Sequence, residues 1–422
     1  MSIRRIQIKL IELLVLLLPY HYLVFAVILR EFPILKLWRD IVMIVVVLLD
    51  VPKCKFKLNS SVVVDFIFTL ITIIYIFNSP NIIQAIQIAR VYILPMFLFH
   101  VVQNLEIYEI EIKGLLQKIY TNTIILCVYG LFQALVLGES FLIRLGYGSD
   151  QTELGSQFYL SNYSGHILEQ SIQRVVSTFS SANICSFYFC IIFIVFMFVK
   201  NQLDISKRKY NCFMILVGVT IVFSFSRSSW LALGISIIIF ARKEIVKLIS
   251  KMRTTVIVCC ILIIGIFVLV PSIRNSIIHV IMASFSGSDT SIISHFMTIN
   301  NAKDLIRNNP FGLGLGQNGP RALNYGASNL VESSIYLMVF EYGIIGALVY
   351  FYDYIYIFFV SLSKRKCDEN MAELNICIVV FVLIAFINIP YVQEIECTAM
   401  FYIMSGLVLK KLNSNRSREK KI

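Results

Sequence analysis

Arg227 is the residue of this chain that is best placed to do chemistry. It lies in the run Ser226-Arg227-Ser228, a short polar tip between two apolar stretches. A guanidinium group is planar, always charged and suited to binding phosphate oxygens. A charge between apolar stretches is costly and marks a candidate site. The alternative is an interfacial arginine that reaches lipid headgroups beside Trp230.

Two further arginines lie next to or inside apolar stretches. Arg174 opens a run that leads into an apolar stretch near residue 183, where it faces a phosphate, caps its loop or pairs with Glu169. Arg90 lies inside an apolar stretch, so its charge must face a partner or a cavity. We count both arginines among the candidate substrate-binding residues.

A glycine-dense segment, NPFGLGLGQNGPR, runs from Asn309 to Arg321. Glycines allow tight turns and a close approach of the backbone to a ligand. Because no Gly-Lys-Ser/Thr follows, the segment does not fit a nucleotide P-loop. It is either a tight re-entrant turn or a direct ligand contact. Arg307 and Arg321 flank it, either as phosphate ligands or as solvated loop charges.

Glu332 is the candidate general base, since a carboxylate at the edge of an apolar stretch can have its pKa tuned by its surroundings. The alternative is a carboxylate that the helix dipole favours at a helix start, with Asn329 as the cap. We include Asn329 with Arg307 among the substrate-binding candidates. Glu341, deeper in the same stretch, is interpreted as paired or structural.

Neither the histidines nor the cysteines indicate a metal centre. His166, His279 and His295 are scattered, and the ten cysteines contain no paired CxxC spacing. We therefore expect no metal and no cofactor.

The composition requires lipid as a solvent. Of the 422 residues, 58% are hydrophobic and only 15% are charged, whereas soluble domains carry about 25% charged residues. Helices satisfy their own backbone polar groups and cross a bilayer in about 17–25 apolar residues. The net charge of +12 lies in short loops between apolar stretches, so topology explains it and no nucleic-acid partner is expected.

We expect an all-α polytopic membrane protein that forms a single integral membrane domain over residues 1–422. About twelve transmembrane helices are predicted, near residues 10–29, 34–50, 61–77, 82–101, 120–137, 183–199, 211–225, 229–241, 254–270, 333–360, 374–390 and 396–409. The tenth is long and is expected to be tilted or broken near Gly343 and Gly346.

The basic residues predict the orientation. When the N-terminus is placed inside, seven inner segments hold most of the lysine and arginine, so both termini are cytoplasmic. Two long outer loops follow, 138–182 and 271–332, and the second could hold a short helix at 291–307. Loops of this length are usually functional. No internal repeat is visible, which argues against a transporter built from two similar halves.

Three stretches in this order resemble the O-antigen polymerase/ligase family: 174–183, 225–232 and 309–346. The resemblance is strongest over roughly residues 170–350. Ligase-type members carry a histidine near the start of the tenth span, and Glu332 stands there in this chain. This difference favours a polymerase.

The resemblance implies a metal-independent glycosyltransferase with a GT-C-like helical architecture in the bacterial plasma (inner) membrane, with its large extracytoplasmic loop between spans nine and ten. Its substrates would be oligosaccharides on undecaprenyl pyrophosphate, and its product a surface polysaccharide, O-antigen or capsule. Membrane lipids and a chain-length regulator protein are the further partners. Arg174, Arg227 and Arg321 would bind pyrophosphate, whose charge cationic donors stabilise. Arg227, Arg321 and Glu332 are the catalytic candidates.

Three other functions remain open. A ligase would move finished glycan to another acceptor. A flippase or transporter should show charged residues along several mid-membrane spans. In this sequence Arg90 alone is a basic residue clearly inside a predicted span. A non-catalytic scaffold predicts that the arginines have no effect.

Overall fold

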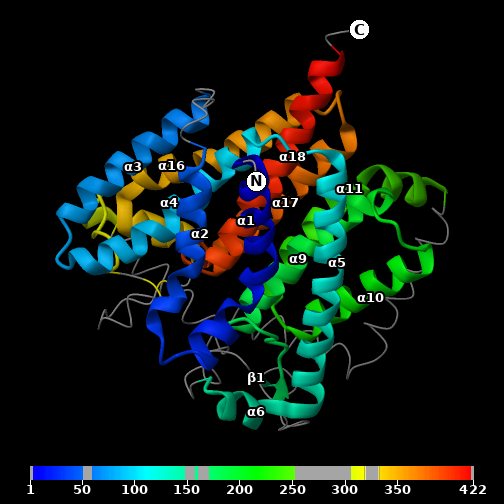
Figure 1. Ribbon diagram of the computed structural model, residues 1–422, viewed down its shortest axis with the longest axis horizontal. Coiled ribbons are helices and arrows are strands. Elements are labelled where there is room, and N and C mark those ends of the chain that lie inside the picture. Colours follow the sequence, from blue (N-terminus) through cyan, green and yellow to red (C-terminus); the bar gives the residue numbers. More distant parts are fainter. Residues whose placement is uncertain are drawn as a thin grey trace, which may run out of the picture.

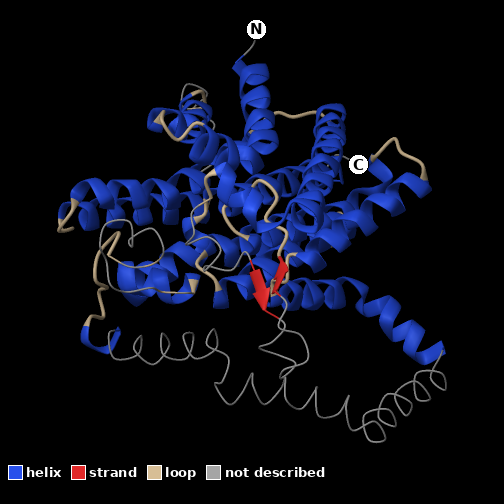
Figure 2. Ribbon diagram, turned by 90° about the horizontal axis from the view of Figure 1, so that it is seen from below, coloured by secondary structure: helices blue, strands red, loops and turns tan. Residues whose placement is uncertain are grey.

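The computed structural model describes residues 3–50, 59–147, 157–159, 171–251, 306–317, 319, 331 and 333–419. This part of the chain is helical apart from one small antiparallel hairpin, drawn red in Figure 2. The hairpin pairs β1 (Gln157–Tyr159) with β2 (Ser171–Gln173), and Gln157 lies opposite Gln173.

Figure 1 shows the helices of the described residues in chain order from blue to red. Their bounds are α1 (Ile3–Leu17), η1 (Leu18–Tyr20), η2 (Tyr22–Ile28), η3 (Pro33–Leu37), α2 (Trp38–Leu48), α3 (Ser60–Phe77), α4 (Ile82–Asn104), α5 (Glu109–Phe132), η5 (Gln133–Leu137), α6 (Gly138–Leu145), α9 (Ala182–Val199), η7 (Lys200–Gln202), α10 (Lys207–Phe223), α11 (Arg227–Lys251), α16 (Ser334–Ser363), α17 (Glu369–Asn388), η8 (Tyr391–Gln393) and α18 (Ile395–Glu419).

Six described helical segments are long and apolar enough to cross a membrane. They are Ser60–Phe77, Ile82–Asn104, Glu109–Leu145, Ala182–Gln202, Ser334–Ser363 and Glu369–Asn388, and Arg227–Ala241 is a shorter apolar helix. Together they make the chain a helical, multi-pass membrane protein.

Polar caps set the starts of several of these helices. A side-chain oxygen at each cap accepts a backbone N–H of the first turn, which would otherwise lack a partner. The caps are Asn59, Asn81, Ser181, Ser206, Ser333 and Asp368.

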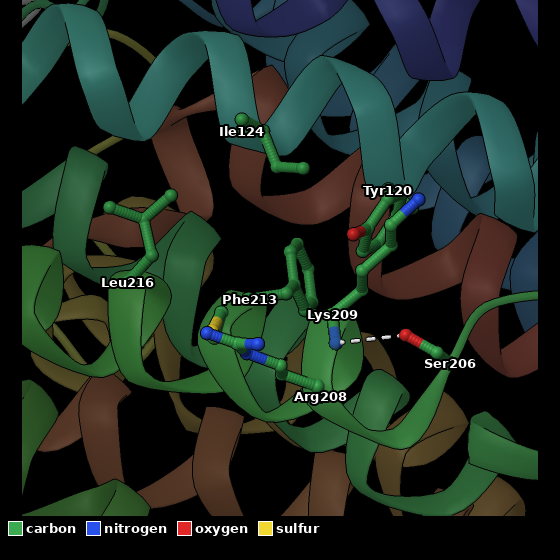
Figure 3. A pocket seen from close by; sticks show the side chains of 8 residues that line it. Tyr120, Ile124, Ser206, Arg208, Lys209, Phe213 and Leu216 are labelled. Atoms are coloured by element: carbon green, nitrogen blue, oxygen red, sulfur yellow. Dashed lines mark hydrogen bonds between the residues drawn. The ribbon is translucent and has the colours of Figure 1, made fainter.

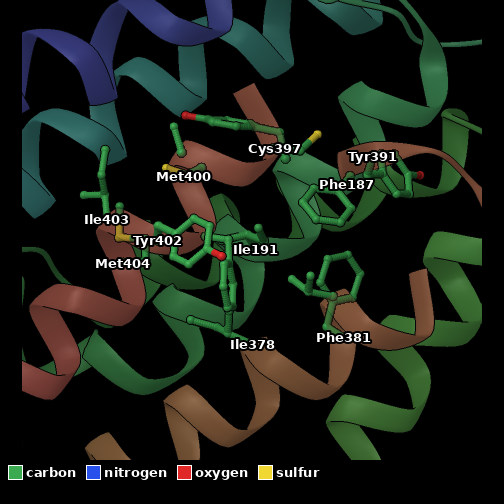
Figure 4. Close-up of a cluster of buried hydrophobic side chains, with 14 of the residues drawn as sticks. Phe187, Ile191, Ile378, Phe381, Tyr391, Cys397, Met400, Tyr402, Ile403 and Met404 are labelled. Carbon is green, nitrogen blue, oxygen red and sulfur yellow. The ribbon is translucent and has the colours of Figure 1, made fainter. Parts of the chain in front are cut away.

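The innermost helices are α9, α17 and α18, whose side chains form the core. Figure 4 shows Phe187 and Ile191 of α9 next to Ile378 and Phe381 of α17, with Tyr402 of α18 beside Ile191. Outer helices instead present large apolar side chains to the surroundings; Leu70 and Phe77 of α3 are 61% and 75% exposed. Such a face requires lipid.

The expected break in the tenth span is confirmed: Gly343 has a φ of 69° inside α16. The first expected span, 10–29, differs from the structure. Its α-helix ends at Leu17, and a 3-10 turn and a π-helix follow, because Pro19 lacks the N–H that a continuing helix needs.

Two other expectations need adjustment. The second span, 34–50, contains a 3-10 turn before the short α2, and the loop 138–182 begins with α6 and holds the β1–β2 hairpin. The ninth span, 254–270, lies outside the described residues, as does most of the loop 271–332.

Candidate functional site

The short helix η8 joins the three motif segments that the sequence singles out. It connects α17 to α18, and its Tyr391 and Gln393 are buried. Tyr391 contacts the 174–183 and 225–232 stretches, and Gln393 contacts the 309–346 stretch. Segments that are distant in sequence therefore meet at one place.

Arg174 connects the first motif to the second. Its side chain is only 8% exposed. Its Nε donates to the Ser224 carbonyl at 2.7 Å, and an Nη donates to Asn183 Oδ1 at 2.8 Å. The next residue, Val175, donates its backbone N–H to Phe223 O at 2.9 Å. The guanidinium is thus held in one orientation by the end of α10 and the start of α9.

The backbone is strained beside both of these motifs. Ser177 and Phe225 have φ values of 54° and 48°, a left-handed conformation that is rare for residues other than glycine. Ser177 is held there because its Oγ donates to Leu126 O at 2.9 Å. Strain of this kind persists only where surrounding contacts enforce it, and it is typical of functional sites.

A chain of hydroxyl groups runs from the α10–α11 turn to α9. Ser226 Oγ donates to Ser229 Oγ at 3.0 Å, Ser229 Oγ lies 3.3 Å from the Tyr391 hydroxyl, and Tyr391 donates to Asn183 O at 3.2 Å. Burial raises the pKa of Tyr391 above its ordinary value, so its hydroxyl stays protonated and can donate.

Arg227 stands at the first position of α11, directly on this framework. Its side chain is exposed, whereas Ser226, the residue before it, and Ser229, two residues after it, are buried. Trp230 donates its indole N–H to Ile221 O at 2.9 Å, which fixes the ring against α10. A helix N-terminus carries partial positive charge, so it and the Arg227 guanidinium together suit an anion.

Glu341 holds the glycine-dense segment to the helices. Its side chain is fully buried and accepts from the Tyr92 hydroxyl at 2.5 Å, the Gly316 N–H at 3.2 Å and Gln393 Nε2 at 3.5 Å. The interpretation of Glu341 as a paired, structural carboxylate is confirmed. It links α4, α16, η8 and the glycine-dense segment.

The glycine-dense segment lies in a tight turn against α16. The backbones of the two segments approach closely at Gly312 and Gly343. A Cβ on Gly343 would lie 2.4 Å from Pro310 O, and one on Gly312 would lie 2.6 Å from Gly343 N. Leu313 donates its N–H to Phe340 O. The kink in α16 therefore makes room for the segment.

Two residues near the α3–α4 turn hold the other side of the segment. Tyr75 donates to Phe311 O, and Gln84 Nε2 donates to Gly316 O. The tight-turn interpretation therefore accounts for these glycines. Ligand contact, the other interpretation, stays a prediction.

The start of α16 is also held at η8. Ser334 Oγ donates to Ile389 O at 2.7 Å and accepts the Val392 N–H at 3.2 Å. Three predicted residues of this region, Arg321, Asn329 and Glu332, lie outside the described residues. Arg307 is described, and its side chain is exposed on a short helical turn beside the glycine-dense segment.

Arg90 has a partner that the sequence did not reveal. Its guanidinium lies 2.9 Å from Asp40 Oδ2, and the same region holds a buried ion pair between Arg39 and Glu396. Asp40 is 4% exposed, so the carboxylate that meets Arg90 is buried. The structure does not bring Arg90 into contact with Arg174 or Arg227.

A shallow groove of about 530 Å³ lies elsewhere, between α5 and α10 (Figure 3). Tyr120 and Ile124 face Phe213 and Leu216 across it, and Arg208 and Lys209 stand at one end. None of the predicted site residues lines this groove.

Sequence reasoning missed Tyr391, Gln393 and Tyr92, which connect the motifs. A signal was present for two of them: Tyr391 and Gln393 lie in a short stretch after Pro390, between two apolar runs. Tyr92 gave no signal, because a tyrosine inside an apolar run is indistinguishable from a core residue.

Residues 212–351 match the O-antigen ligase family. Over these residues the chain is similar to the O-antigen polymerase/ligase family. The matched region starts in α10, includes Arg227 and the glycine-dense segment, and ends within α16. The comparison with curated proteins found no match.

Proposed function

We propose that this protein is a polymerase that joins oligosaccharide repeat units, carried on undecaprenyl pyrophosphate, into a surface polysaccharide. The observation that carries the proposal is the convergence of all three family-like stretches on η8, next to the exposed Arg227. The family match supports a role in surface-glycan assembly, as polymerase or ligase.

The proposed chemistry is glycosyl transfer from one lipid-linked unit to the sugar of another. The leaving group is a pyrophosphate, whose developing charge a fixed cationic donor stabilises. Arg227 and Arg321 serve as these donors, and Glu332 orients or deprotonates the attacking sugar hydroxyl. Arg174, Arg307, Arg90 and Asn329 bind substrate. Of these, Arg174 has its guanidinium fixed by hydrogen bonds to Ser224 O and Asn183 Oδ1.

The proposed topology has twelve spans, a GT-C-like arrangement, cytoplasmic termini in the bacterial inner membrane and the large outer loop 271–332 between spans nine and ten. It is supported by contacts that join the ends predicted to be cytoplasmic. Arg4 pairs with Glu111, Lys113 with Asp204, and Lys364 with Asn413.

Contacts at the opposite ends support the same topology. Tyr75 and Gln84, at the predicted outer ends of α3 and α4, both bond the glycine-dense segment. In Figure 1, α18 ends toward the top, whereas α6 and β1, from the first predicted outer loop, lie at the bottom.

The deciding experiment extracts and sizes the lipid-linked glycans of a strain that lacks this protein. Single repeat units that accumulate on undecaprenyl pyrophosphate in the outer leaflet are the result expected for a polymerase. Long lipid-linked chains would establish a ligase, and single units in the inner leaflet a flippase. An unchanged glycan profile would remove all three functions. Complementation with Arg227→Ala then separates a catalytic role from a scaffold.

A further inference from the structure

Three buried polar side chains converge far from η8. Asp65 of α3, His100 of α4 and Asp353 of α16 are each no more than 1% exposed. One ligand atom from each lies within 4.8 Å of the others. The three helices lie together on the left of Figure 1, and α3 packs against both α4 and α16. None of these residues takes part in the site at η8.

The charges of this cluster are not balanced within the protein. The ionisable groups that act on Asp353 are Asp65 and His100. Over the described residues, no lysine or arginine forms an ion pair with either carboxyl group. Two carboxylates cannot remain ionised together in a dry interior without a counter-charge. Either protons or a cation must supply it.

The hydrogen bonds of the cluster leave polar atoms that a cation can use. His100 Nε2 lies 2.5 Å from Asp65 Oδ2, and Ser61 donates to Asp353 Oδ1. Asp65 Oδ1, Asp353 Oδ2 and His100 Nδ1 have no hydrogen-bond partner, although all three side chains are buried. The two carboxyl groups also interact directly with each other, and a metal ion between them would contact both. Orphaned buried oxygens are otherwise costly.

We propose that Asp65, His100 and Asp353 bind one divalent transition-metal-type cation, such as Zn²⁺ or Co²⁺. A single such ion balances two carboxylates. An imidazole with two carboxylate oxygens is a ligand set that these ions accept, whereas Mg²⁺ and Ca²⁺ prefer sites with six or more oxygens.

The geometry requires little movement for the ion to enter. Metal–ligand bonds of about 2.0–2.2 Å place ligand atoms up to about 4.4 Å apart across the ion, so small side-chain rotations suffice. The short His100–Asp65 contact opens as the ion inserts. Ser61 then orients Asp353 from outside, as hydrogen-bonded partners of metal ligands do. The ion joins α3, α4 and α16, and its presence does not depend on the proposed polymerase activity.

The test uses the full-length chain, purified in detergent without a histidine tag and stripped with chelator. The stripped protein is titrated with Co²⁺ alone, and bound metal is measured by mass spectrometry and by visible d–d absorption. Wild type is expected to bind one equivalent per chain, with bands that Zn²⁺ abolishes. Asp65→Asn, His100→Gln and Asp353→Asn should each lose the stoichiometric equivalent.

Asp50→Asn is the matched control, because Asp50 is also buried and accepts from Gln7 but lies outside the cluster. It should bind one equivalent. Equal Co²⁺ in wild type and Asp353→Asn would overturn the proposal. If the variants do not fold, the wild-type titration alone decides: a saturable one-to-one absorption band and a higher Tm support the site, and a flat titration overturns it.

Discussion

At the scale of single residues, the candidate arginines have different surroundings. Arg174 and Arg90 are engaged with protein groups, Ser224 and Asp40, whereas the Arg227 side chain is exposed at a helix start. Sequence alone ranked Arg227 first because a charge between two apolar runs is costly unless it has a function. It could not separate Arg174 from Arg90, because Ser224 and Asp40 each lie 50 positions away in the chain.

Arg227→Ala should reduce polymer formation by about 10²–10³-fold, the usual cost of removing one charge-stabilising donor. Arg227→Lys should restore only part of it, because a lysine lacks the planar fork. The measurement is polysaccharide length and amount in a complemented deletion strain, at matched protein levels. Arg208→Ala, an exposed arginine at the start of α10, is the control and should behave as wild type. Normal polymer from Arg227→Ala would remove Arg227 from the catalytic residues.

Tyr92→Phe should lower the free energy of unfolding by about 1–3 kcal/mol, because Glu341 would lose a buried donor. The measurement is the thermal unfolding of the detergent-solubilised protein. Tyr352→Phe is a matched control in α16, since the Tyr352 hydroxyl forms no hydrogen bond within the described residues and its ring still stacks on Tyr356. Equal loss in both variants would mean that the Glu341 network does not hold the glycine-dense segment.

At the scale of elements, the kink in α16 and the glycine-dense segment form one unit. The sequence indicated both features, since the glycines of each are visible in it. That they touch each other was not readable, because the contact joins Gly312 to Gly343 across a turn of the fold. Capped helix starts were readable for the same local reason: Asn59 and Ser333 bond residues only three positions away.

Gly343→Ala should abolish the docking of the glycine-dense segment, because its Cβ would meet the Pro310 carbonyl and the φ of 69° is left-handed. We expect loss of polymer and faster proteolytic cleavage near residues 309–317. Gly234→Ala in α11 is the control: its Cβ would meet open space, so it should be neutral or stabilise by up to about 1 kcal/mol. Wild-type protease resistance in Gly343→Ala would contradict the role of this contact.

Arg39 and Glu396 join α2 to α18 as a buried ion pair, with side chains 7% and 8% exposed. Arg39→Met should cost about 3–5 kcal/mol of stability, because it leaves the Glu396 charge buried without its partner. The double variant with Glu396→Gln should recover much of that loss. Thermal unfolding of the four proteins in one detergent gives the coupling. Additive losses would show that the pair is not coupled.

At the scale of the whole molecule, hydropathy predicted α3, α4, α9, α10, α16 and α17 to within a few residues at each end, because lipid exposure leaves a long apolar signature. It misplaced an end of α5, α11 and α18, where the helix continues into polar sequence. Hydropathy did not predict the end of the α-helix α1 before Pro19. It also did not predict the buried polar contacts between helices, such as that of Arg39 with Glu396. Pairing across helices depends on which faces meet, and one sequence does not carry that information.

The proposed topology predicts which engineered cysteines a membrane-impermeant maleimide reaches in intact cells. In a cysteine-free background, Glu139→Cys in α6 should be labelled, and Lys207→Cys at the start of α10 should be labelled only after the membrane is opened. The two positions lie at opposite ends of the predicted spans. The reverse labelling pattern would show that the proposed topology is inverted and that the η8 site lies on the cytoplasmic side.

The contact between Ser61 and Asp353 spans 292 positions in the chain, which has a consequence for biogenesis. During synthesis, α3 and α4 enter the bilayer long before α16 is made, so Asp65 and His100 must wait there without Asp353. A ribosome that stops before residue 334 releases a chain whose polar pair has no third helix to cover it. In such a chain Asp65 and His100 lack the helix that covers them in the finished protein, so their polar groups stay uncovered inside the bilayer.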